Sequence, residues 1–146
     1  IYDGNAFFYN NISSIDSTTL TSKPYRLIRV IFHTPFISNT FPINLGILLR
    51  KIWQRYIDFE NEYGTNMTIP LSHIDSEITN YHKTFHTLYY TRSQAFIRLH
   101  GFTGWINYKI YTADDKAYNL LKLGTFIGAG PRSSFGCGFF TIQPFT

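Results

Sequence analysis

The chain has 146 residues, of which 18% are aromatic and only 15% are charged. A chain this rich in apolar residues is not disordered, its single cysteine excludes a disulfide scaffold, and no apolar run reaches the roughly 18 residues of a membrane span. Thirteen Lys and Arg against nine Asp and Glu give a net charge of +4. Because nothing after Ile1 reads as a signal peptide, we expect a fragment of a longer cytoplasmic protein.

The start of the chain predicts a polar arm followed by a strand. Residues 1–22 are expected to form a leading arm or linker, and residues 23–146 a single domain. Residues 23–33 are rich in aromatic and branched aliphatic side chains, which favours a strand. Proline interrupts strand hydrogen bonding, so we expect this strand to end before Pro35.

A helix is predicted next. Between residues 45 and 59 the apolar side chains recur at helical spacing, and Gly64 marks the expected end. Three cations lie off this apolar stripe and are expected to face outward: Arg50, Lys51 and Arg55. Residues 65–80 contain a proline and mixed polar residues and give no assignment.

The second half of the chain predicts two strands, a helix and a last strand. Residues 84–99 and 105–111 are rich in β-forming residues, and we expect Gly101 and Gly104 to separate them as a turn. A short helix is expected after Asp114 and Asp115, which are placed to cap it. The predicted elements are strands at 84–99, 105–111 and 139–145, and this helix with Ala117, Leu120, Leu121 and Phe126 on its apolar face.

The resulting order is strand, helix, strand, strand, helix, strand. This order is typical of an α+β, ferredoxin-like (RRM-like) βαββαβ domain, in which two helices cover one face of an antiparallel sheet. Many RNA-binding modules are built in this way, although the fold by itself decides no function.

Cations are separated from acids along the chain. No acid occurs between residues 17 and 57 or between residues 78 and 113, although the first segment holds six Lys and Arg and the second holds four, among them Lys83 and Arg92. Such a distribution favours a positively charged face that attracts polyanions. An ordinary solvated surface with a small excess of cations is the alternative.

Residues 128–138 form a glycine-rich segment with two Gly-x-Gly units around a cation and two serines. Consecutive amides in such a loop can form a concave anion site, and an arginine and hydroxyl groups add donors for phosphate oxygens. The segment is neither a P-loop, since no Gly-Lys-Ser/Thr ends it, nor a dinucleotide fingerprint, since it follows a helix and enters a strand. A tight structural turn remains the alternative.

This loop resembles the signature of the RAMP superfamily, and within it the C-terminal domain of the CRISPR-associated repeat-cleaving endoribonuclease, the sixth Cas family. The likeness covers roughly residues 23–143 in the expected order. Besides the loop, it rests on four shorter pieces: residues 32–35, 90–94, 101–108 and 120–124.

The resemblance implies a domain that binds CRISPR repeat RNA and has other Cas proteins as further partners. The reaction that it implies is metal-independent cleavage, in which the ribose 2′-hydroxyl attacks the adjacent phosphate. We carry over no catalytic residue, cofactor or metal, because the catalytic histidine of many members belongs to an N-terminal domain. The expected RNA-binding residues are Gly128, Gly130, Arg132, Ser133, Ser134, Gly136, Gly138, Arg92 and Lys83. A non-catalytic scaffold subunit of a CRISPR effector complex is the alternative.

The histidines give no clear catalytic or metal site. His33 would be the catalytic residue, as general acid or base, if this chain cleaved RNA alone, and a hydrogen-bonded strand-end histidine is the alternative. His82 and His86 have the spacing of a helical zinc pair, but no acid or cysteine completes a site. Cys137 lacks a neighbouring base and is expected to pack as a small apolar residue.

Overall fold

The computed structural model describes residues 26–63, 74–92, 94–132 and 136–144, and the arm expected over residues 1–22 lies outside them. Within these described ranges, four strands and two helices follow one another in the order expected for a ferredoxin-like α+β domain, which is confirmed. The elements are β1 (Arg26–Ile37), α3 (Leu45–Tyr63), β2 (Ile74–Arg92), β3 (Ala95–Ala113), α4 (Asp115–Ile127) and β4 (Phe140–Pro144).

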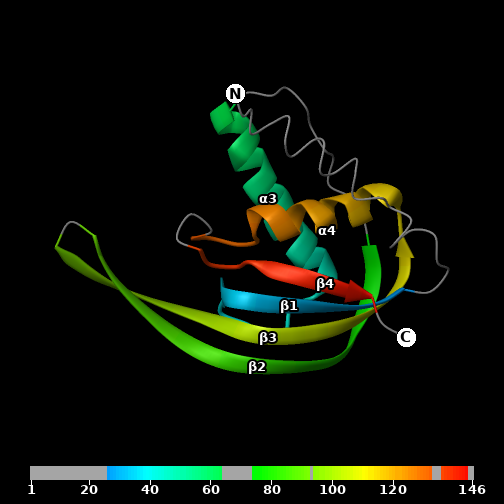
Figure 1. The fold of residues 1–146 in the computed structure, drawn as a ribbon, viewed down its shortest axis with the longest axis horizontal. Coiled ribbons are helices and arrows are strands. Elements are labelled where there is room, and N and C mark those ends of the chain that lie inside the picture. The colour runs from blue at the N-terminus through cyan, green and yellow to red at the C-terminus, as the bar shows by residue number, and fades with distance from the viewer. Residues whose placement is uncertain (1–25, 64–73, 93, 133–135, 145–146) are drawn as a thin grey trace.

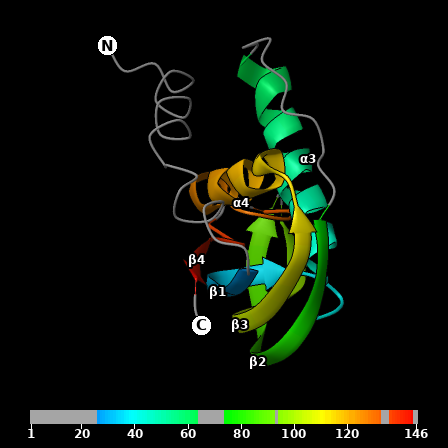
Figure 2. The same cartoon turned by 90° about the vertical axis from the view of Figure 1, so that its right-hand side faces the viewer.

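The strands form one antiparallel sheet in the order β2-β3-β1-β4 (Figure 1). In the centre of the sheet, Ile28 of β1 pairs with Tyr108 of β3 on one side and with Pro144 of β4 on the other. Both helices cover the same face of the sheet, as the view along its edge shows (Figure 2). We call this the helix face and the opposite one the outer face.

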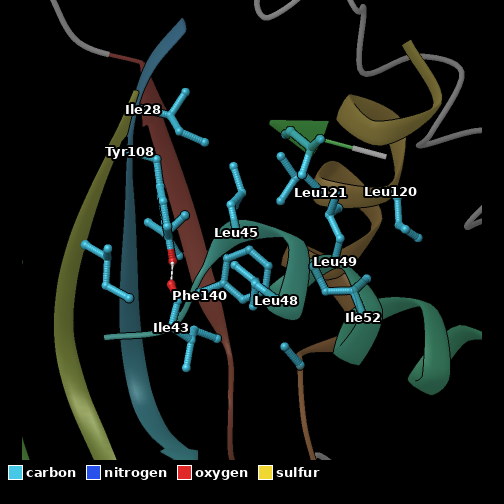
Figure 3. Close-up of a cluster of buried hydrophobic side chains, with 14 of the residues drawn as sticks. Ile28, Ile43, Leu45, Leu48, Leu49, Ile52, Tyr108, Leu120, Leu121 and Phe140 are labelled. Atoms are coloured by element: carbon cyan, nitrogen blue, oxygen red, sulfur yellow. Dashed lines mark hydrogen bonds between the residues drawn. The ribbon is translucent and has the colours of Figure 1, made fainter. Parts of the chain in front are cut away.

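The core lies between the helix face and the two helices, where branched and aromatic side chains meet (Figure 3). The expected helical stripe is confirmed, since Leu45, Leu48, Leu49, Ile52 and Tyr56 of α3 are all buried. Strands alternate their side chains between faces, so Val30 and Ile106 are fully buried while Arg29 and Trp105 lie on the outer face.

Both predicted helices are held by specific polar contacts at their ends or flanks. Asp114 caps α4 as expected, because its carboxylate oxygen Oδ1 accepts a hydrogen bond of 2.8 Å from the amide of Ala117. The segment that leads into α3 is fixed to the sheet, because the buried hydroxyl of Tyr108 donates a hydrogen bond of 2.6 Å to the carbonyl oxygen of Ile43. Among the described residues, neither helix is long and apolar enough to cross a membrane.

The predicted end of the first strand was wrong, because β1 continues through Pro35 to Ile37. The pairing between β1 and β3 shifts register between Phe32 and Phe36, and Pro35 lies within this irregular part. A proline without an amide hydrogen is tolerated at such a place because no ladder hydrogen bond is required of it.

The predicted turn at Gly101 and Gly104 was also wrong, since both lie inside β3. Gly104 has a φ of 132°, and a Cβ atom there would overlap the backbone carbonyl of His82 in β2. This glycine therefore permits two strands to approach each other closely, which a sequence pattern cannot distinguish from a turn. The hairpin turn lies instead between Arg92 and Ala95.

The β2–β3 hairpin extends beyond the rest of the sheet. The pairing of β1 with β3 ends where Ile37 meets Gly101, whereas β2 and β3 stay paired up to Arg92 and Ala95. Residues 87–100 therefore form a projecting two-stranded arm, which extends sideways beyond the helices and curves toward the side of the sheet that they cover (Figure 1). We call it the hairpin arm.

Candidate nucleic-acid interface

The base of the glycine loop is a packed part of the fold. The loop joins α4 to β4, and its two ends are linked directly, because the amide of Ala129 donates a 3.0 Å hydrogen bond to the carbonyl of Gly138. The amide of Gly138 in turn donates to the carbonyl of Pro35 in β1 at 2.8 Å. Gly128, Ala129, Cys137 and Gly138 are buried. This part of the predicted site therefore shapes the loop and offers little surface to a ligand.

The glycines of the loop adopt a backbone conformation that other residues rarely accept. Four of them have positive φ angles between 77° and 86°: Gly128, Gly130, Gly136 and Gly138. At Gly138 a side chain is excluded for two reasons: the positive φ angle, and the overlap that a Cβ atom would have with the backbone carbonyl of Ala129. At Gly136 a Cβ atom would meet nothing within 4 Å. The two ends of the loop thus use glycine for different reasons.

The tip of the loop is accessible. Pro131 and Gly136 are exposed, and Gly130 and Arg132 are half-buried. Ser133 and Ser134, which were expected to bind phosphate, lie outside the described residues. The tip is closed by a 3.2 Å hydrogen bond from the amide of Cys137 to the carbonyl of Arg132. Of the predicted loop residues that are described, Arg132 is the one that brings charge to the surface.

A cavity of about 350 Å³ lies between this tip and the polar side of α3. It is lined by Gly130, Pro131 and Arg132 from the loop and by Lys51, Gln54, Arg55 and Asp58 from α3. Three cations therefore surround one carboxylate, and Asp58 already accepts a 3.1 Å hydrogen bond from Gln54. The buried Nε atom of Arg55 has no hydrogen-bond partner among the described residues, so a bound anion could satisfy it.

A second cavity, of about 550 Å³, shares Lys51 and Pro131 with the first. It extends over residues 37–40 to Arg98 and His100 at the root of the hairpin arm. The two cavities adjoin at these shared residues, and we call the surface that they form the basic groove, after the cations that line it: Lys51, Arg55, Arg98 and Arg132. It brings together three segments that are distant in sequence.

Sequence reasoning found only part of the groove. Lys51 and Arg55 were predicted to face outward from the helix, but nothing in the sequence placed them beside the glycine loop. Arg98 had a similar signal, since it belongs to the segment without acids. These residues line the same cavities as Pro131 because of the way α3 and β3 pack around the loop.

The two predicted RNA-binding residues of β2 lie apart from the loop. Lys83 is exposed on the helix face, and its Nζ atom lies 5.7 Å from the centre of the Phe102 ring. Arg92 ends β2 opposite Ala95, and its side chain is not among the described parts. Lys83 is not among the described residues that line the basic groove.

The histidines and the cysteine are explained by local contacts. His33 lies on the outer face, where its Nε2 atom is 2.7 Å from the hydroxyl of Thr141, and it therefore does not face the basic groove. His82 and His86 lie on a strand instead of a helix, which separates them by roughly 13 Å along the chain. Burial raises the pKa of the Cys137 thiol, while the charge of Arg132 lowers it to a smaller extent.

Two comparisons relate the sequence of this chain to known proteins. A model of the AF_1859_C family, described as a C-terminal domain, matches residues 28–142. An uncharacterized protein of Archaeoglobus fulgidus is 35% identical over 98% of this chain, and the chain spans 50% of that relative's length.

Solved structures share the fold. A partial Cas6-RT-Cas1–Cas2 complex matches with a TM-score of 0.59 at 12% identity, covering 94% of this chain and 26% of the other. A mutant of a Cas6 protein matches with a TM-score of 0.52 at 17% identity, covering 94% of this chain and 57% of the other. The resemblance to the repeat-cleaving endoribonucleases is therefore confirmed for the fold. The chain belongs to the AF_1859_C family as its C-terminal domain, and it has the fold of the Cas6 structures.

Proposed function

We propose that this domain binds CRISPR repeat RNA as the C-terminal half of a metal-independent endoribonuclease. The observation that carries the proposal is the basic groove, which places Arg132 of the glycine loop beside Lys51 and Arg55 of α3. The fold shared with Cas6 structures supports the assignment to CRISPR RNA processing. Repeat RNA is the proposed substrate because its phosphates match the charge of the groove.

The proposed reaction is attack of a ribose 2′-hydroxyl on the adjacent phosphate, which leaves a cyclic phosphate and frees the 5′-oxygen of the next nucleotide. It needs a general base, a general acid and cations near the pentavalent phosphorus. This chain supplies cations through Arg132, Lys51 and Arg55. We assign the base and the acid to the other half of the protein, because His33 does not face the groove.

Filter binding of a structured repeat RNA at several salt concentrations tests the binding role. We expect Arg132→Ala to weaken binding by roughly three- to tenfold and to lower the slope of log K against log salt by about 0.7 to 0.9, the value for one lost phosphate contact. Lys83→Ala is expected to act in the same direction. Lys116→Ala is the matched control, since Lys116 is exposed in the first turn of α4, at the end remote from the loop.

An unchanged affinity and salt slope in both Arg132→Ala and Lys83→Ala would contradict the assigned surface. Cleavage is tested separately, by incubating the domain with repeat RNA and EDTA and probing for a cyclic phosphate end. Cleavage by this domain alone that is lost in His33→Ala would contradict the assignment of catalysis to the other half.

A scaffold role is the second candidate, in which the domain assembles with Cas proteins and does not cleave RNA. The observation that favours it is the fold shared with a Cas6-RT-Cas1–Cas2 complex. A scaffold would bind free repeat RNA poorly and would co-purify with Cas proteins. Tight RNA binding by the isolated domain would exclude this role.

A further inference from the structure

Large aromatic rings are exposed along the helix face of the long hairpin. Tyr81, Phe85 and Tyr89 of β2 are 43%, 56% and 61% exposed, and Phe96 of β3 is 75% exposed. Their spacing of every fourth residue along β2 keeps the three rings of that strand on the same face. A folded protein seldom leaves so many rings in water on one surface without a binding role.

The rings form cross-strand pairs. Near the end of the hairpin arm, the Tyr89 and Phe96 ring centres lie 6.1 Å apart. Further in, Phe85 stacks on His100 with the centres 5.3 Å apart and the planes inclined by 23°. We call these four side chains the aromatic ladder. The two pairs lie four residues apart along β2, which corresponds to roughly 13 Å of strand.

Cations alternate with the rings. Arg98 lies directly across from Tyr89, between Phe96 and His100 along β3. Lys83 follows inward from Phe85, with its Nζ atom 5.7 Å from the Phe102 ring. No acid occurs between residues 78 and 113. The hairpin therefore offers rings and positive charge together, which suits a polyanion with flat apolar groups.

The aromatic ladder is also continuous with the basic groove. His100 belongs to both, and Arg98, which lies between Phe96 and His100 along β3, lines the larger cavity with it, together with Lys51 and Pro131. A strand of nucleic acid whose phosphates occupy the groove can thus continue onto the hairpin arm without leaving the surface.

We propose that the aromatic ladder binds unpaired ribonucleotides, whose bases stack on Tyr89, Phe96 and Phe85 while Arg98 and Lys83 contact the phosphates. Every base presents a flat π-face, so stacking tolerates any sequence. In a duplex these faces are covered by neighbouring base pairs, so the ladder selects a single-stranded segment. The proposal rests on the proposed function, because the groove must place the RNA beside the arm.

A 12-nucleotide oligouridylate with one central 2-aminopurine is the probe, and a blunt RNA duplex with strands of the same length is its counterpart. We expect Phe96→Leu and Tyr89→Leu each to weaken binding of the single strand by about tenfold and to remove the fluorescence quenching that stacking causes. Binding of the duplex should stay unchanged. Tyr111→Leu is the matched control, because Tyr111 is 51% exposed on the outer face of the same strand.

Equal affinity and equal quenching in wild type and both ladder variants would overturn the proposal. Sedimentation gives a second contrary outcome. If the wild-type protein self-associates, and Phe96→Leu makes it monomeric without changing its RNA affinity, the ladder is a protein contact and the proposal is overturned. Arg132→Ala with the repeat RNA keeps the two proposals separate, because it tests the groove without altering the ladder. Circular dichroism of each variant confirms that the fold is intact.

Discussion

The amide of Gly138 donates a 2.8 Å hydrogen bond to the carbonyl oxygen of Pro35, which ties the end of the glycine loop to the irregular part of β1. A side chain has no room at Gly138, because a Cβ atom there would overlap the backbone carbonyl of Ala129 at the other end of the loop. The position of the accessible tip is therefore decided by packing at its base.

This relationship predicts different costs for two alanine substitutions in the same loop. Gly138→Ala should lower the free energy of unfolding by at least about 2 kcal/mol, because a positive φ and a backbone overlap must both be relieved. Gly136→Ala should lower it by only about 1 kcal/mol, since its φ is strained but the space is open. Urea denaturation measures both, and equal costs would contradict the packing described for Gly138.

A substitution of Arg55 should lower the affinity for RNA without lowering the stability of the fold. Arg55→Met keeps the length of the side chain but removes a guanidinium whose buried Nε has no partner among the described residues. We expect the free energy of unfolding to stay within about 0.5 kcal/mol or to rise, while the affinity for repeat RNA falls by roughly three- to tenfold. Arg50→Met is the control, because Arg50 is exposed on the same helix and does not line the groove. A loss of stability without a loss of affinity would assign Arg55 to the fold.

Tyr108 is expected to contribute through its hydroxyl as well as its ring. Tyr108→Phe leaves the carbonyl oxygen of Ile43 without the 2.6 Å hydrogen bond that it accepts in the core. The expected loss is about 1–3 kcal/mol in the free energy of unfolding. Tyr111→Phe, on the exposed outer face, should change it by less than about 0.5 kcal/mol. Thermal denaturation of the two variants side by side tests the difference.

Cys137 should resist modification in the native state. Burial raises the pKa of its thiol above the ordinary value of 9.0, so the thiolate that reacts is scarcer in the folded protein than in the unfolded chain. The linked stabilisation is complete below that value and is lost as the pH rises through the native pKa. We expect slow reaction with an aromatic disulfide reagent at pH 8 and fast reaction in denaturant. Rapid native labelling would contradict the burial, and Cys137→Ala removes both signals.

Local patterns in the sequence predicted the elements whose own side chains decide them. The apolar stripe of α3, the Asp114 cap of α4 and the alternation of β3 are such cases, because helical and strand periodicities are properties of neighbouring residues. The order of these elements was then sufficient to predict the ferredoxin-like fold. The glycine loop could also be recognised in the sequence, because its closely spaced glycines are typical of a segment with several positive φ angles.

Only the tertiary structure decided where the strands stop and which cations meet. Gly104 looks like a turn in the sequence, and the backbone of His82, 22 residues earlier, is what requires a glycine there. Lys51, Arg98 and Arg132 come from a helix, a strand and a loop, and no spacing along the chain relates them. Side chains far apart in sequence become neighbours through packing, so a groove of this kind has no local signal.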